Sequence, residues 1–97
     1  MTYELVEDYL NRRTSYREQH LSLAREAHQR GELVLAGALS EPADRALLVF
    51  RVPHRSMVEE FAKNDPYVVN VLVRQWEVRP WTLVIGVQPD APPSPKS

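Results

Sequence analysis

The sequence predicts an α+β domain in which one antiparallel sheet carries two helices on the same face. Three observations predict it. Four strand-like runs occur along the chain, two helix patterns separate them in the order β-α-β-β-α-β, and the third run, residues 46–52, is apolar at nearly every position. A continuous apolar run indicates a central strand that is covered on both faces.

The first half of the chain predicts a strand, a helix and a second strand. Residues 3–10 have strand-like character. Ser15, followed three residues later by Glu18, fits a capping box that starts a helix running to about residue 30. Gly31 is the expected end of that helix, because glycine tolerates the left-handed conformation found there, and residues 33–39 follow as the second strand.

The third strand is followed by a second helix. A turn-rich link, residues 40–44, precedes the strand. Ser56 and Glu59 then fit another capping box, and the short helix that they start is expected to run to about Lys63.

Beyond that helix the chain predicts a further turn and two strands. Asp65-Pro66 begins a helical turn that we expect to continue to about Leu72. Residues 73–78 form the fourth strand. A proline interrupts the chain before residues 81–87, which we expect to add a fifth strand at the edge of the sheet.

This order is the ferredoxin-like pattern with one extra C-terminal strand. Residues 47–50 are apolar on both faces of their strand, so the sheet face away from the helices needs cover. We therefore predict a two-fold homodimer that packs through this sheet face. The domain is expected to span residues 1–87, and residues 88–97, which hold four of the eight prolines, to form a disordered tail.

Composition excludes several classes of function. The 97 residues carry 12 basic and 13 acidic side chains, a net charge of −1, whereas a nucleic-acid binder normally shows a basic excess. The absence of cysteine excludes disulfides and thiolate catalysis. We identify no signal peptide and no apolar run of the roughly 20 residues that a membrane span needs, and therefore expect a cytoplasmic protein without membrane contact.

His20 is the first candidate for chemistry. On a helix it shares an apolar face with Tyr16, Leu23, Ala24 and Ala27, so its imidazole would point toward the sheet. Histidine titrates near neutrality and can serve as an acid or a base. The alternative is a core histidine satisfied by a backbone carbonyl, and the sequence leaves both interpretations open.

Asp65 and two arginines are further candidates. Asp65 could orient an imidazole or act as a base, or it could only cap the helix that begins at Pro66. Arg13 and Arg17 could hold an anion, or they could be solvated or paired with nearby acidic side chains. The three histidines lack metal-ligand spacing and the three glycines form no phosphate-binding loop, so we expect neither a metal nor a cofactor.

Four short motifs together resemble those of the YCII-related (YciI-like) family. They are Arg13-x3-Arg17-x2-His20-Leu21, Gly31-x-Leu33-x3-Gly37, Asp65-Pro66-Tyr67 and Val78-Arg79-Pro80-Trp81. The motifs occur in order and with the right spacing across residues 3–86. The resemblance implies a dimeric α+β barrel assembly, and an active site built from the first-helix histidine and the Asp-Pro aspartate.

The resemblance also implies a range of chemistry. A characterised branch of the wider family removes chloride from a chlorinated hydroxyquinol, and structurally similar dimers isomerise small lactones. Both are acid–base reactions on small cyclic anions. We therefore expect His20 to act as the acid or base, Asp65 to hold its tautomer, and Arg13, Arg17 and Tyr67 to bind an unidentified small-molecule ligand.

The chain departs from the family pattern at two positions. Val71 stands where a glycine is usual and is expected to narrow the pocket, and Ala38 stands where a proline is frequent. An elimination or isomerisation enzyme is therefore one hypothesis. A non-catalytic small-ligand-binding or accessory dimeric domain is the other. The two differ in whether solvent reaches His20, and in whether His20→Ala abolishes turnover or only lowers stability.

Overall fold

The computed structural model of the chain describes residues 1–86. Its elements are β1 (Thr2–Leu5), α1 (Tyr9–Arg12), the 3-10 turn η1 (Arg13–Ser15), α2 (Arg17–Gln29), β2 (Leu33–Ala38), β3 (Arg45–Phe50), α3 (Arg55–Asn64), α4 (Pro66–Val69) and β4 (Val73–Glu77). The main elements keep the predicted β-α-β-β-α-β order, and the short pieces α1, η1 and α4 are added to it.

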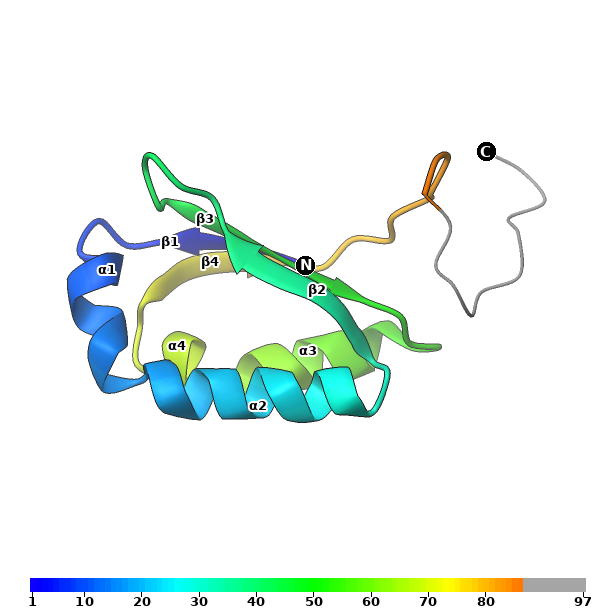
Figure 1. Cartoon of the computed structure of the whole chain (residues 1–97), viewed down its shortest axis with the longest axis horizontal. Helices are drawn as coiled ribbons and strands as arrows, with labels where there is room; N and C mark the ends of the chain where they lie inside the picture. The colour runs from blue at the N-terminus through cyan, green and yellow to red at the C-terminus, as the bar shows by residue number, and fades with distance from the viewer. Residues whose placement is uncertain (87–97) are drawn as a thin grey trace.

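The four strands form one antiparallel sheet in the order β2-β3-β1-β4. Figure 1 shows α2, α3 and α4 together on one side of this sheet. This α+β arrangement is compatible with the ferredoxin-like fold that the sequence predicts. Within residues 1–86, no helix is both long enough and apolar enough to cross a membrane.

The core lies between the sheet and the helices. Tyr3 of β1 and Leu48 of β3 are buried there against Ala27 of α2 and Phe61 of α3. Each large apolar side chain buried in this way contributes about 1.5–3 kcal/mol to stability. The packing fixes α2 and α4 over the same end of the sheet, and this is where the candidate site forms.

The opposite face of the sheet is apolar over β2 and β3. Leu35 pairs with Val49, and Gly37 pairs with Leu47, so these side chains share the face that points away from the buried Leu48. Leu35 and Leu47 are 67% and 40% exposed. This is the face through which the sequence predicts a homodimer.

β1 ends at Leu5, so the strand predicted over residues 3–10 is too long. The Val6 N–H donates to the Leu72 carbonyl at 3.0 Å, and the Tyr9 N–H donates back to the Val6 carbonyl at 3.1 Å. These bonds turn the chain into α1. Tyr9 is buried, so the turn carries its ring into the core instead of along the sheet.

Both predicted capping boxes are wrong. Helix α2 has Tyr16 at its N-cap without a side-chain hydrogen bond, because η1 leads directly into it and contains Ser15. Helix α3 has an extended His54 at its N-cap, so Ser56 already lies inside the helix. The preceding backbone, not the serine, sets where each helix starts.

The predicted helix end at Gly31 is confirmed. Gly31 has φ +78°, its N–H donates to the His28 carbonyl, and the Glu32 N–H donates to the Ala27 carbonyl. These two bonds form a Schellman motif, which needs a left-handed residue at this position.

The predicted start of α4 at Asp65-Pro66 is also confirmed, but its predicted end is wrong. The Asp65 side chain accepts a hydrogen bond from the Tyr67 N–H at 3.0 Å. The helix ends at Val69, short of the predicted Leu72. Val71 has φ +60°, and a right-handed helix cannot continue through that conformation.

Residues 81–86 do not form the predicted fifth strand. Pro80 has no N–H to donate to a ladder, and Figure 1 shows the chain leaving the sheet after β4. Ile85 is 90% exposed. Residue 87 and the predicted tail, 88–97, lie outside the described residues, so the domain boundary stays a prediction.

Candidate functional site

His20 and Asp65 lie together, although 45 residues separate them in the chain. His20 projects from α2, and Asp65 is the N-cap of α4. The His20 Nδ1 and the Asp65 Oδ1 are 2.8 Å apart. The Asp65 side chain is fully buried, whereas 14% of the His20 side chain is exposed. His20 is therefore the member of the pair that solvent or a ligand can reach.

The two carboxylate oxygens of Asp65 accept hydrogen bonds from three donors. Oδ1 accepts from the Tyr67 N–H at 3.0 Å as well as from His20, and Oδ2 accepts from the Tyr3 hydroxyl at 2.8 Å. A carboxylate can only accept, so His20 must carry its hydrogen on Nδ1. Nε2 of the neutral ring is then left with a free lone pair. The same carboxylate thus caps α4 and orients the imidazole.

Tyr3 secures the far side of this carboxylate. Its side chain is 1% exposed. Burial, the charge of Asp65 and the hydrogen bond between them raise the pKa of Tyr3 well above its usual 10.0. The hydroxyl therefore keeps its proton and remains a donor to Asp65. The structure places Tyr3 on the inward face of β1, and nothing local in the sequence indicates that its hydroxyl contacts a residue 62 positions away.

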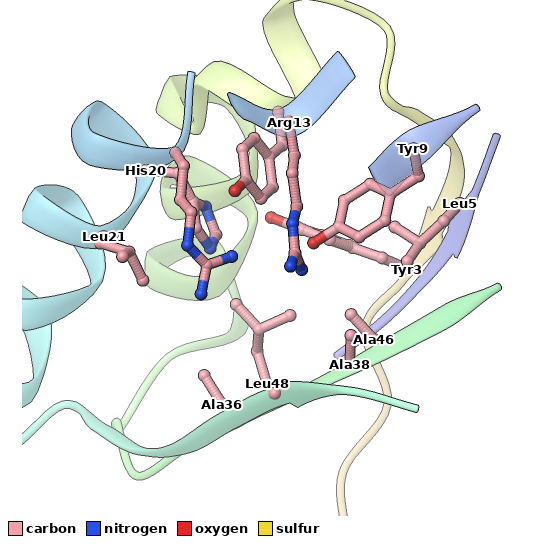
Figure 2. A pocket seen from close by; sticks show the side chains of 13 residues that line it. Tyr3, Leu5, Tyr9, Arg13, His20, Leu21, Ala36, Ala38, Ala46 and Leu48 are labelled. Carbon is pink, nitrogen blue, oxygen red and sulfur yellow. The ribbon is translucent and has the colours of Figure 1, made fainter. Parts of the chain in front are cut away.

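A cavity of about 180 Å³ opens beside His20, between α2 and the sheet. We call it the His20 cavity. On the sheet side it is lined by the small side chains Ala36, Ala38 and Ala46, which leave room above the strands. Figure 2 shows these alanines across the cavity from His20 and Arg13. The sequence did not predict this wall of small residues, because single alanines in strands carry no functional signal.

Arg13 and Arg17 both line the His20 cavity. Figure 2 shows the Arg13 side chain reaching into the space between His20 and Tyr9, and the Arg13 Cζ is 5.6 Å from the centre of the Tyr9 ring. Among residues 1–86, neither guanidinium forms an ion pair with a carboxylate; the nearby Asp8 lies 3.9 Å from Arg12 instead. Two uncompensated cations thus border the cavity, and this favours an anionic ligand.

Tyr67 also lines the His20 cavity, as the family resemblance implies. Its ring is stacked on the His20 ring, with centroids 3.9 Å apart, and meets Tyr9 edge to face at 5.6 Å. Burial and Tyr9 raise the pKa of Tyr67, whereas Arg17 and Arg13 act in the opposite direction. Arg17 also acts on the buried hydroxyl as a hydrogen-bond donor, but the hydroxyl's own proton has no acceptor among the described residues.

The expectation that Val71 narrows the pocket is wrong. Val71 does not line the His20 cavity, and its side chain is 61% exposed. Position 71 matters for the backbone instead, since Val71 adopts a left-handed φ of +60°, a conformation that glycine adopts without strain. Ala38, the other departure, does line the cavity.

The other histidines lie away from the site. The His28 Nδ1 is 2.7 Å from the Leu33 carbonyl, and His54 is the N-cap of α3. Within residues 1–86, no group of three or more His, Cys, Asp or Glu side chains is arranged to hold a metal ion.

Comparison with known proteins identifies the family. No curated protein matches the sequence. The model of the YCII-related domain family matches residues 2–82, a span that contains His20, Asp65 and every residue of the His20 cavity. The chain belongs to the YCII-related domain family.

Proposed function

We propose that this protein is a small-molecule enzyme that uses His20 and Asp65 as an acid–base pair. One observation carries the proposal: His20 is bonded through Nδ1 to a buried carboxylate while its ring borders a cavity with two uncompensated guanidiniums. A base must be oriented, and its reactive nitrogen must be accessible. The bond to Asp65 supports the first condition, and the place of His20 at the cavity supports the second.

The cavity suits a ligand with a single ring. At about 180 Å³ it is slightly larger than the roughly 150 Å³ cavity that accepts benzene in an engineered protein. Arg13 and Arg17 would bind a carboxylate or phenolate on that ring. The aromatic rings of Tyr9 and Tyr67 would pack against its faces.

The reaction class that fits is proton abstraction from carbon, followed by elimination or isomerisation. The His20 Nε2 would take the proton, and Asp65 would stabilise the imidazolium that forms. In an isomerisation the imidazolium would return the proton to another carbon. In an elimination a leaving group would depart with its electron pair. Neither path needs a redox partner.

The working unit in this proposal is a homodimer. The apolar face that carries Leu35 and Leu47 would be buried against a second copy, as predicted from the sequence. The His20 cavity lies on the helix side of the sheet, so the dimer would leave it accessible.

A non-catalytic ligand-binding domain is the second candidate. The full burial of Asp65 and its role as a helix cap favour it, because a stability role alone would explain both. The network of Tyr3, Asp65 and His20 would then serve only to fix the fold.

The test is an NMR screen of small cyclic carboxylic acids with the wild-type protein and with His20→Asn. Asparagine keeps a donor for Asp65 but cannot accept the substrate proton. An enzyme predicts conversion by the wild type and loss of conversion in His20→Asn, with binding retained. If both proteins bound the acids and neither converted any of them, the enzyme proposal would be wrong and the non-catalytic ligand-binding domain would take its place.

A further inference from the structure

Tyr3 and Tyr67, two of the buried tyrosines that line the His20 cavity, differ in whether the hydroxyl has a hydrogen-bond acceptor. The Tyr3 hydroxyl donates to Asp65 at 2.8 Å. The Tyr67 hydroxyl has no acceptor for its proton among residues 1–86, although the residue is only 2% exposed. Buried hydroxyls are almost always hydrogen-bonded, and each exception calls for a reason. Tyr67 lines the His20 cavity, so the missing acceptor points to a ligand.

The surroundings of Tyr67 define what that partner must be. Arg13 and Arg17 are close enough to affect its pKa, but a guanidinium only donates hydrogen bonds. Neither arginine can accept the phenolic proton. Burial raises the pKa of Tyr67, so this proton stays on the oxygen at neutral pH. The ligand must therefore supply an acceptor oxygen.

The position of Tyr67 relative to His20 indicates when this bond matters. The two rings are stacked 3.9 Å apart with an angle of 9° between their planes, and both border the same cavity. A ligand oxygen on Tyr67 would thus lie close to the atom on which His20 acts. A donor aimed at an oxygen that gains negative charge lowers the barrier for proton abstraction.

We propose that the Tyr67 hydroxyl is the oxyanion donor of this site, and that the ligand is a ring acid with a carbonyl oxygen in addition to its anionic group. This inference rests on the proposed function and assigns Tyr67 a catalytic role in it. The anionic group lies at Arg13 and Arg17, and the carbonyl oxygen lies at Tyr67.

The step balances without a further reagent. The His20 Nε2 takes a proton from the carbon next to the carbonyl. The electron pair of that C–H bond forms a C=C bond to the carbonyl carbon, and the C=O pair moves to the oxygen that Tyr67 holds. If a further C=C bond of the ligand is conjugated with this enolate, the His20 imidazolium returns the proton to the far carbon and an isomer forms. If a leaving group is on the β-carbon, the C=O bond re-forms, a C=C bond forms between the α- and β-carbons, and the group leaves with its electron pair.

A first experiment needs no ligand. Tyr67→Phe removes a hydroxyl whose proton has no protein acceptor and which meets only the Arg17 donor, so we expect little change in melting temperature. Tyr3→Phe, the same chemical change, removes the donor to Asp65 and should lower the melting temperature. An equal loss in both variants would show that the Tyr67 hydroxyl is already bonded within the protein, and would overturn the proposal.

A second experiment uses two probes that differ by one oxygen, 4-oxocyclohexanecarboxylate and cyclohexanecarboxylate. The wild type should bind the oxo acid roughly tenfold more tightly, the order of one hydrogen bond. Tyr67→Phe should abolish this preference and leave the affinity for the plain acid unchanged. Tyr16→Phe, a tyrosine that does not line the cavity, is the control and should keep the preference.

The outcomes separate the two claims. Equal binding of both probes by the wild type would overturn the role of Tyr67 and leave the anion site standing. A tenfold preference that survives in Tyr67→Phe would do the same. Failure of the wild type to bind either probe would contradict the anion site itself, and both the proposed function and this inference would fall.

Discussion

The His20 ring lies flat on the Tyr67 ring, with their centroids 3.9 Å apart and their planes 9° from parallel. Tyr67 follows Asp65 by two residues, and Asp65 holds the edge of the same imidazole at 2.8 Å. One short turn at the start of α4 therefore supplies both the carboxylate that bonds the His20 ring and the aromatic surface that supports it. The geometry of the site depends on that turn.

Asp65→Ala should destabilise the protein by about 3 kcal/mol. It removes a helix cap, worth about 1 kcal/mol, and leaves the buried Tyr3 hydroxyl without its acceptor, which costs about 1–3 kcal/mol. Urea unfolding measures the loss. Asp65→Asn is the matched variant, because its amide oxygen can still cap α4, and it should lose less. A loss below about 1 kcal/mol in Asp65→Ala would contradict the network.

Stability should fall above about pH 10, and Tyr3 should contribute to the fall. Tyr3 is buried with its pKa raised above the usual 10.0, so it stays protonated in the folded state while an unfolded tyrosine ionises. The unfolded state then binds fewer protons, and the free energy of unfolding decreases by about 1.4 kcal/mol per pH unit for this residue.

Urea unfolding of wild type and Tyr3→Phe, between about pH 9 and about pH 11, checks this prediction. The variant is less stable at the lower pH, but its free energy of unfolding should fall less steeply as the pH rises. The slopes should differ by about 1.4 kcal/mol per pH unit, the effect of one titrating proton. If the free energy of unfolding fell equally steeply with pH in both proteins, Tyr3 would ionise equally easily in the folded and unfolded states, and the prediction would be wrong.

Val71→Gly should stabilise the protein by about 1 kcal/mol. A β-branched residue with φ +60° is strained by about 1–3 kcal/mol, and glycine relieves this strain at some cost in unfolded-state entropy. Val69 offers a control, because it is equally exposed but lies within α4. Val69→Gly should destabilise. Thermal unfolding that showed a loss in both variants would contradict the strain at Val71.

Arg13→Gln and Arg17→Gln should each weaken binding of cyclohexanecarboxylate roughly tenfold, the order of one charge-assisted hydrogen bond. Added salt should also weaken binding to the wild type, because it screens the attraction between the guanidiniums and the carboxylate. Arg25→Gln is the control, since Arg25 lies on the exposed part of α2 and does not line the His20 cavity. Isothermal titration measures all three. Equal affinities across the variants would remove the arginines from the site.

Local features of the sequence predicted part of this architecture. Gly31 and Asp65-Pro66 act through their own backbone and side chain, so their roles at helix ends could be predicted without knowing the fold. The inward direction of His20 followed from the apolar face of α2 in the same way.

Features that depend on distant contacts could not be predicted. The capping boxes failed because the chain before each helix, an η1 turn or an extended residue, sets where the helix starts. The bond from Tyr3 to Asp65 joins residues 62 positions apart. Val71 was expected to act on the pocket through its volume, but its effect is on the backbone, which its residue type alone does not reveal.

The exchange of carbon-bound hydrogen in D2O tests the central claim most directly. 4-Oxocyclohexanecarboxylate has hydrogens next to its carbonyl, and NMR follows their replacement by deuterium even if no further product forms. We expect exchange to be faster with the wild type than in buffer, and to fall by about 100-fold or more in His20→Asn, because a general base contributes a factor of that order. Exchange by His20→Asn at the wild-type rate, or no acceleration by the wild type, would contradict an acid–base role for His20.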